Sequence, residues 1–327
     1  MQFSRDHRAK ADTVSGTKCI KAKACGEEMS TMNPLGVDGI EYVEYVTLEP
    51  QSFGAALERL GFAAVARHRS REIVLYRAGG MNVIVNADPA VAGSADEDTL
   101  APRLKAFALR VRDAAAAYSH CIEKGAWPIS DNYAGNAAPR AGAMELNIPG
   151  IMGVGDSVIY FVDRYEEFSI YDVDFKKIPS VAEAPPAIAG MHFFGIVQAI
   201  EEARTKEWVD FYKELFGFTV LPQGQYFGVL PKGTLLESPC RKFYLQLVEP
   251  PEQAAVLAWQ EKLTRVGFGA PDITALVAQL AARGVTFIES NSVHTSDKGA
   301  VTYLGGTSFE FVKSHLGAGE AAAEVRA

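Results

Sequence analysis

The sequence predicts an α+β protein made of two tandem domains, each a pair of βαβββ modules. Three observations lead to this prediction. Short apolar segments alternate with segments of helical periodicity, the same order of segments occurs twice, and a stretch rich in proline and alanine separates the two copies. Two such modules side by side curl their sheets around a cavity open on one side, and alternate residues of each strand point into it.

Two alignments within the chain indicate the internal repeat. Residues 107–129 align with residues 266–288 and place Asp113 opposite Asp272, each at the start of an expected helix. An aspartate at that position accepts hydrogen bonds from the first backbone N–H groups of a helix, so both residues are expected to be helix caps. The segment GIEYVEYV also aligns with GMHFFGIV. The repeat therefore predicts four modules arranged in two pairs.

The domain boundaries follow from the linker, residues 176–190, which is rich in proline and alanine. We expect the division between the halves near residue 185. The predicted organisation is a flexible N-terminal tail (1–35), a structural βαβββ-pair domain (36–180), a βαβββ-pair domain with the active site (186–316) and a C-terminal tail (317–327).

The expected elements of the first half run in module order. Residues 39–48 predict a strand, residues 51–62 a helix that stops at Gly61, and residues 71–89 two strands joined by a Gly-Gly turn and closed by Pro89. The second module is expected as a strand (106–113), a helix (114–125) and two further strands (126–130 and 156–165).

The second half repeats this plan. Its helix at 205–218 carries an aromatic and aliphatic stripe at the i, i+3, i+4 spacing of an amphipathic helix. The other expected elements are a strand at 190–200, a strand at 240–251, a strand–helix–strand unit within 263–290, and strands within 300–315.

Composition excludes several classes of protein. The formal net charge of -8 and the pI near 5.4 argue against a nucleic-acid partner, which would call for a basic face. No apolar run approaches the roughly 18–20 residues that cross a bilayer, so no membrane partner is expected. Four scattered cysteines and a polar N-terminus without an apolar region predict a cytoplasmic protein. Composition leaves homo-oligomerisation open.

Two apolar strands each carry one polar side chain that a metal ion could use. His192 lies within GMHFFGIVQ and Glu310 within GGTSFEFVKSH, on the first and last strands of the second half. A polar group inside an apolar strand is unfavourable unless it finds a partner. We therefore predict that His192 and Glu310 meet in the cavity as metal ligands. The alternative for His192 is an ordinary hydrogen-bonded core histidine.

The segments RHRSREIVLYRAGGMNVIVNADP, AMELNIPGIMGVGDSVIYFVDRY and SIYDVDF resemble the N-terminal half of bacterial 4-hydroxyphenylpyruvate dioxygenases. They are equally similar to the dioxygenase-like domain fused to some 3-dehydroshikimate dehydratases. MHFFGIV, WVDFYKELFGF and SFEFVKSH resemble the metal-bearing second half. The resemblance runs from about Gly36 to His315 and implies the vicinal oxygen chelate superfamily, whose glyoxalase- and dioxygenase-like half-barrels are paired βαβββ modules.

The resemblance implies one Fe(II) ion held by two histidines and a glutamate. Carried over by position, the first histidine is His192 and the glutamate is Glu310, but Arg265 stands where the second histidine is expected. Arginine is permanently charged and has no lone pair, so it cannot bind iron. Either Glu310 binds a metal ion together with His192, or it pairs with Arg265 and no metal is bound. At close range these two arrangements exclude each other.

Other residues could complete the site. Gln246 is a candidate metal or substrate ligand, with a half-buried polar residue as the alternative. Arg265 could bind the carboxylate of an aromatic acid whose ring contacts Tyr303 and Phe309, and the alternative is a structural ion pair beside core aromatic residues.

The leading hypothesis from the sequence is a non-haem Fe(II) dioxygenase similar to 4-hydroxyphenylpyruvate dioxygenase that acts on an aromatic 2-oxo acid with O2. Its site would comprise His192 and Glu310 as metal ligands, Arg265 as a catalytic residue, and the substrate-binding residues Gln246, Tyr303 and Phe309. One alternative is a metal-free protein of the same fold that binds a small aromatic acid. Another is a member of the superfamily that uses a divalent metal without oxygen.

Overall fold

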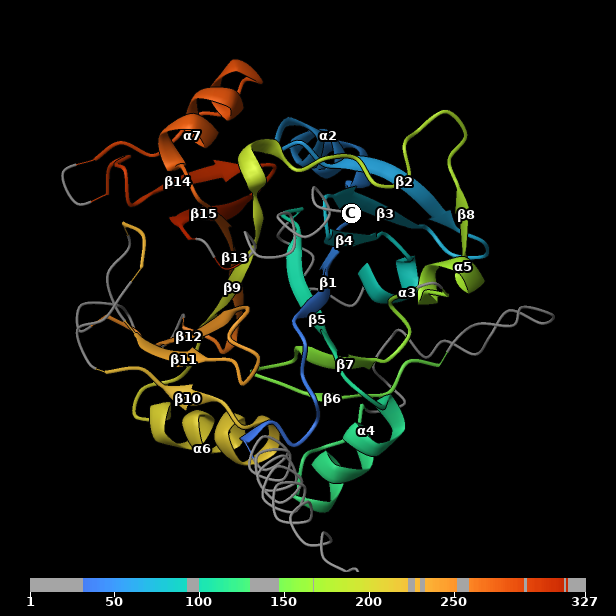
Figure 1. Ribbon diagram of the computed structural model, residues 1–327, viewed down its shortest axis with the longest axis vertical. Helices are drawn as coiled ribbons and strands as arrows, with labels where there is room; N and C mark the ends of the chain where they lie inside the picture. Colours follow the sequence, from blue (N-terminus) through green and yellow to red (C-terminus); the bar gives the residue numbers. More distant parts are fainter. Residues whose placement is uncertain are drawn as a thin grey trace, which may run out of the picture.

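The computed structural model describes residues 32–92, 100–129, 147–166, 168–222, 227–229, 233–251, 259–290, 293–314 and 316. These residues form two β-sheets, one from each half of the chain, with helices around them (Figure 1). The predicted α+β class with two tandem halves is confirmed. The exact domain boundaries stay a prediction, and most of the first tail and all of the second lie outside the described residues.

The N-terminal sheet has eight strands in the order β6-β7-β5-β1-β4-β3-β2-β8. Its centre is the antiparallel pair of β1 and β5, the first strands of the two modules, flanked by β4 and β7, which run parallel to them. The strands are β1 (Ile40–Val46), β2 (Ala63–His68), β3 (Ile73–Ala78), β4 (Met81–Asn86), β5 (Arg103–Arg110), β6 (Gly150–Met152), β7 (Val158–Val162) and β8 (Phe175–Lys177).

The C-terminal sheet has seven strands in the order β10-β11-β12-β9-β13-β15-β14 and repeats this topology. Its antiparallel centre is β9 and β13, flanked by the parallel strands β12 and β15. The strands are β9 (His192–Ala199), β10 (Thr219–Val220), β11 (Thr234–Glu237), β12 (Tyr244–Val248), β13 (Lys262–Ala270), β14 (Gly299–Leu304) and β15 (Thr307–Lys313).

The helices follow the first strands of the modules. Asp113 and Asp272 cap α4 and α7 by accepting from the N–H groups of Ala116 and Ala275, at 2.8 and 2.9 Å, so the predicted pair of caps is confirmed. The helical elements are α2 (Pro50–Arg59), α3 (Pro89–Ala92), α4 (Ala114–Glu123), α5 (Ile170–Asp174), the short 3₁₀ turn η2 (Ile188–Gly190), α6 (Thr205–Phe216) and α7 (Ile273–Ala282).

Two predicted strands are not formed, and they occupy the same place in the repeat. Of the predicted strand 126–130, the described residues 126–129 make one isolated bridge, between Pro128 and Ile151, and proline has no N–H to donate to a ladder. Residues 285–290 run beside β14 without forming a strand: the N–H of Ile288 donates to the carbonyl of Val301 at 2.8 Å, and the hydroxyl of Thr302 donates to the carbonyl of Thr286 at 2.6 Å. The structure adds β2, which lies between the predicted helix and the predicted hairpin.

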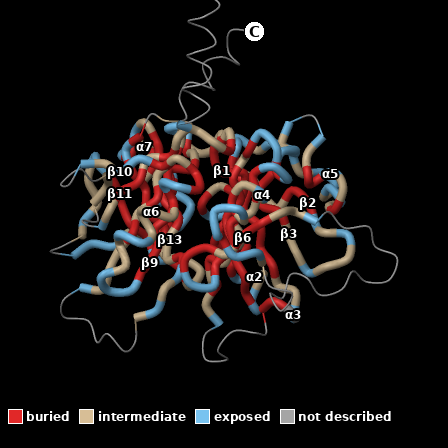
Figure 2. The backbone as a smooth tube through the Cα atoms, turned by 90° about the horizontal axis from the view of Figure 1, so that it is seen from below, coloured by how far each residue is buried: buried red, intermediate tan, exposed pale blue. Residues whose placement is uncertain are grey.

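One hydrophobic core lies between the two halves. Buried residues run through the middle of the molecule in Figure 2, and a single cluster contains side chains of both sheets. Phe268 of β13 lies 5.8 Å from Phe62, ring centre to ring centre, and Phe309 of β15 lies 6.2 Å from Tyr45 of β1. Each sheet therefore has one face on the shared core, and the other face of the N-terminal sheet carries a second, smaller cluster that includes Tyr42, Leu75 and Tyr171.

A polar contact also joins the halves. The guanidinium group of Arg283, at the end of α7, donates to the carbonyl groups of Glu58 and Arg59 at the end of α2, at 2.7 and 3.0 Å. The last carbonyl groups of a helix lack partners within it, and a cation there is favourable.

In the described part of the chain, no helix is long and apolar enough to cross a membrane.

Candidate functional site

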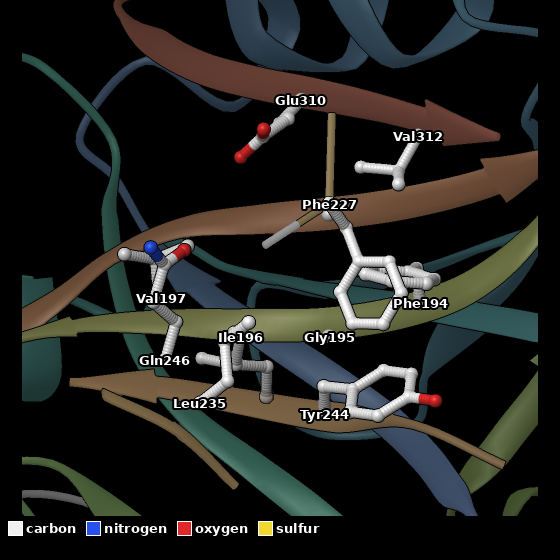
Figure 3. A pocket seen from close by; sticks show the side chains of 11 residues that line it. Phe194, Gly195, Ile196, Val197, Phe227, Leu235, Tyr244, Gln246, Glu310 and Val312 are labelled. Carbon is white, nitrogen blue, oxygen red and sulfur yellow. The ribbon is translucent and has the colours of Figure 1, made fainter. Parts of the chain in front are cut away.

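The cavity of the C-terminal half lies on the face of the sheet away from the core. Figure 3 shows Glu310 and Gln246 toward one end of it and the rings of Phe194, Phe227 and Tyr244 toward the other. The three rings lie 4.8–5.1 Å apart, centre to centre. The cavity volume is about 30 Å³. That volume holds about one or two water molecules and is far below the roughly 300 Å³ of a small ligand pocket.

Glu310 is paired with Arg265 in this cavity. Their strands are neighbours, and Glu310 lies opposite Gly267, two residues after Arg265, so both side chains leave the same face of the sheet. Nε of Arg265 lies 3.3 Å from Oε2 of Glu310, and the two side chains are 18% and 6% exposed. The Nε–H makes no hydrogen bond with a described residue, so the contact is an ion pair without good hydrogen-bond geometry.

The second oxygen of Glu310 is covered by main chain. A Cβ atom placed on Gly228 would lie 2.6 Å from Oε1 of Glu310, and Gly228 has a φ of +70°, which favours glycine. The carboxylate therefore has a guanidinium group on one side and a backbone segment on the other.

His192 contacts Ser314 and the main chain of Gly190. Its Nε2 lies 3.1 Å from the hydroxyl of Ser314 and its Nδ1 lies 3.1 Å from the carbonyl of Gly190. The ring lies over Gly269, where an added Cβ would come within 2.4 Å of Nε2. On β15 the side chain of Val312 comes between Glu310 and Ser314. The structure thus joins Glu310 to Arg265 and His192 to Ser314, and the shared metal site stays a prediction.

The other predicted site residues fall in three different places. Gln246 lines the cavity with Glu310, and its role as a ligand stays a prediction. Phe309 is 1% exposed and points to the core, because neighbours on a strand face opposite sides and Glu310 already faces the cavity. Tyr303 is 61% exposed at the end of β14 and donates its hydroxyl to the carbonyl of Gly306. Phe309 and Tyr303 therefore do not line this cavity, which corrects their expected place in it.

These residues do not fit an iron ion. No group of three or more His, Cys, Asp or Glu residues that could hold a metal occurs in the described part of the chain. The position beside Glu310 is taken by the Arg265 guanidinium group, a cation with no lone pair. Iron at Glu310 would need Arg265 to move away and a further donor to replace it.

The N-terminal half contains a much larger cavity, of about 780 Å³. Its floor is a second ion pair, in which Nε of Arg110 donates to Oε2 of the buried Glu41 at 2.6 Å. Burial raises the pKa of Glu41, and Arg110 lowers it in part. From the sequence alone, this half is expected to be structural. The one signal available was the alignment of Glu41 with His192, two polar residues at matching positions of the repeat.

Comparisons with known proteins agree with this architecture. Residues 31–176 match the family described as hydroxyphenylpyruvate dioxygenase, HPPD, N-terminal. The hemolysin VllY of Vibrio vulnificus is 32% identical over 276 residues, which make up 80% of this chain and 74% of that protein. A 4-hydroxyphenylpyruvate dioxygenase of Pseudomonas sp. is 34% identical over 206 residues, 61% of this chain and 55% of that protein.

Among solved structures, a xylose isomerase-like TIM barrel/4-hydroxyphenylpyruvate dioxygenase fusion protein superposes with a TM-score of 0.66 at 23% identity. The match covers 90% of this chain and 52% of that chain, and it supports the fold. Paired modules whose sheets curl around open cavities define a protein of the vicinal oxygen chelate superfamily. Within it, this chain belongs to the 4-hydroxyphenylpyruvate dioxygenase family.

Proposed function

We propose that this chain is a non-oxygenase member of its family that binds a small organic acid without iron. The observation that carries the proposal is the ion pair between Arg265 and Glu310, at 3.3 Å, on the strands from which the resemblance draws two metal ligands. It corresponds to the second arrangement that the sequence left open, in which Glu310 pairs with Arg265 and no metal is bound.

Electrostatics support this proposal. Two unit charges about 4 Å apart interact by about 4 kcal/mol at an effective dielectric constant of about 20, so a dication beside a guanidinium group meets a repulsion of about 8 kcal/mol. Because Arg265 already neutralises the negative charge of Glu310, Glu310 attracts a metal ion only weakly. A cavity volume of about 30 Å³ is also too small for an aromatic acid, so we place acid binding outside the C-terminal cavity.

A second candidate is an Fe(II)-dependent dioxygenase that acts on an aromatic 2-oxo acid with O2 in the cytoplasm. It is favoured by the similarity to a protein named 4-hydroxyphenylpyruvate dioxygenase and by Gln246, an amide beside Glu310. Fe(II), when bound, supplies sites at which a 2-oxo acid and O2 meet. Here His192, Gln246 and Glu310 would have to hold it.

The two candidates differ in iron binding and oxygen uptake. We would load the purified chain with Fe(II) without air, remove free metal, and measure bound iron and oxygen consumption with 4-hydroxyphenylpyruvate. We expect less than about one tenth of an iron per chain and no substrate-dependent oxygen uptake, because Arg265 holds the position beside Glu310. Stoichiometric iron and uptake that disappears in Glu310→Gln would establish the second candidate instead.

The variant Arg265→His sharpens the test. It removes the cation and supplies an imidazole, the ligand type that first-row metals accept readily, so we expect Co(II) or Fe(II) affinity to rise at least about tenfold. Arg241→His, on a side chain that is 77% exposed, is the matched control and should change nothing. Equal metal affinity in Arg265→His and the unchanged chain would show that Arg265 is not what prevents metal binding.

A further inference from the structure

The N-terminal cavity has the size and the chemistry of a ligand site. Its volume of about 780 Å³ lies within the range of roughly 300–1,000 Å³ of small-molecule pockets. It lies on the face of the N-terminal sheet away from the core. One wall is apolar and includes Val65, Leu75 and Phe175, and the rest is polar and charged.

The Glu41 carboxylate forms the floor and is fully engaged there. Besides the bond from Arg110, it accepts from Nδ2 of Asn82 at 3.2 Å, and the same amide donates to the Glu41 carbonyl at 3.0 Å. The side chain of Glu41 is 2% exposed. The charge of this carboxylate is thus matched first by Arg110, and Arg77 adds a weaker interaction with it.

Arg77 is a cation in this cavity without a carboxylate partner. Its Nε donates to Oδ1 of Asn82 at 2.7 Å and its Nη1 to the carbonyl of Glu183 at 2.8 Å, and both acceptors are neutral. No carboxylate of the described residues lies within ion-pair distance of it. Since a guanidinium group has five N–H donors in a rigid plane, Arg77 is held in place and still has donors for a ligand.

Tyr171 supports Arg77 from inside the cavity wall. Its ring lies under the Arg77 guanidinium group at 5.4 Å, and the residue is 7% exposed. Burial and then the neighbouring Glu41 carboxylate raise the pKa of the Tyr171 hydroxyl, so this hydroxyl lies beside Glu41. The aromatic ring therefore holds the guanidinium group of Arg77 in place.

Charges of both signs surround the mouth of the cavity. Arg69 and Lys176 line it and are exposed, and so are Glu166 and Asp172. Lys177 and Glu183 also line it, and they neutralise each other at 2.8 Å. The charge that favours an anionic ligand is therefore that of Arg77, inside the cavity.

We propose that this cavity binds a small carboxylic acid with an aromatic or apolar body. The carboxylate would pair with the fork of Arg77, and the body would lie against the apolar wall of Val65, Leu75 and Phe175. This inference rests on the proposed function, because it names the site at which the proposed non-oxygenase would bind its acid.

Calorimetry with aromatic carboxylates tests the proposal. We would titrate the full chain with benzoate and 4-hydroxybenzoate, and with 4-hydroxybenzamide as the neutral match. We expect saturable binding of an acid, and at least about tenfold weaker binding of the amide, since a charge-assisted pair with arginine is lost. Acids and amide that bind equally well, or neither binding at all, would overturn the proposal.

Variants locate the site. Arg77→Gln should weaken binding of the acid at least about tenfold, Arg77→Lys should recover part of it, and the surface variant Lys176→Gln should weaken it about two- to fivefold. Arg241→Gln, in the other half, is the matched control. Undiminished binding in a folded Arg77→Gln, judged by circular dichroism, would place the ligand elsewhere. Iron and oxygen measurements do not enter here, so failure of this test removes the N-terminal acid site and leaves the iron-free assignment of the C-terminal half to its own experiment.

Discussion

Each half of the molecule contains a carboxylate and an arginine on neighbouring strands, facing the cavity. In the N-terminal half the pair is Glu41 on β1 with Arg110 on β5, and in the C-terminal half it is Glu310 on β15 with Arg265 on β13. The cavities above these pairs differ greatly, at about 780 and 30 Å³. The ion pair therefore does not determine whether a half can hold a ligand.

The difference comes from what lies over each sheet. In the C-terminal half, Phe227 packs against Phe194 and Tyr244, and Gly228 lies on the carboxylate of Glu310. In the N-terminal half, the segment that follows β7 brings Tyr165 and Tyr171 to the cavity, and each ring stacks on an arginine at 5.3–5.4 Å. Aromatic rings that pack on each other fill space, whereas rings under guanidinium groups form a polar wall.

The largest loss of stability is expected from a change in the hydrophobic core that the two halves share. Phe268 is 0% exposed and contacts rings of both halves, so Phe268→Ala should lower the free energy of unfolding by about 3–5 kcal/mol. Guanidinium chloride unfolding, followed by fluorescence and circular dichroism, should show one transition for the whole chain. The exposed control Tyr303→Ala should change stability by less than about 0.5 kcal/mol. Two separate transitions in the unchanged chain would mean that the halves fold independently.

A smaller loss of stability is expected when either ion pair is broken. Arg110→Met leaves the buried Glu41 without its cation, and Arg265→Met does the same to Glu310. Each change should lower the free energy of unfolding by about 2–3 kcal/mol at neutral pH, after allowance for the partial exposure of both arginines. If either variant is as stable as the unchanged chain, the pair in that half is not structural.

The pH dependence of stability tests the ion pair between Glu41 and Arg110. Burial raises the pKa of Glu41 although Arg110 lowers it, so the folded protein binds this proton more tightly than the unfolded chain. The contribution of Glu41 to stability is then largest at low pH and decreases as the pH rises past the ordinary value of a carboxyl group. In Arg110→Met the pKa rises further, so stability should fall more steeply between about pH 4 and pH 7. Parallel curves for the variant and the unchanged chain would contradict this account.

The smallest effect should be equal in both halves. Asp113→Ala and Asp272→Ala remove matching helix caps, and each should lower the free energy of unfolding by about 1 kcal/mol. Asp113→Asn and Asp272→Asn keep an oxygen acceptor and serve as controls. A clear difference between the two alanine variants would show that the repeat is not equivalent at its helix starts.

Much of the fold could be predicted because it depends on local patterns that occur twice. Matching aspartates marked two helix starts, and a proline- and alanine-rich segment marked the junction. The two predicted strands after α4 and α7 contain apolar residues but do not form ladders: Pro128 has no N–H to donate, and a side-chain hydroxyl, that of Thr302, makes one of the contacts between the second segment and β14. Composition does not reveal such competition for backbone groups.

The site was less predictable because it depends on direction as well as position. Arg265 and Glu310 come together because Arg265 stands two residues before Gly267, the residue that pairs with Glu310, and that register is not visible in one strand alone. Phe309 was assigned to the cavity although it directly precedes Glu310 and must face the other side. The N-terminal cavity depends on Tyr165 and Tyr171, on a segment that has no repeat to compare with.

The alternation of faces along β15 has a consequence for how this family can change. Phe309 and Phe311 support the interior, and Glu310 between them is turned away from it, so a substitution at the outward position leaves the interior packing untouched. A substitution at position 310 can therefore alter the cavity while Phe309 and Phe311 keep the core between the two halves packed.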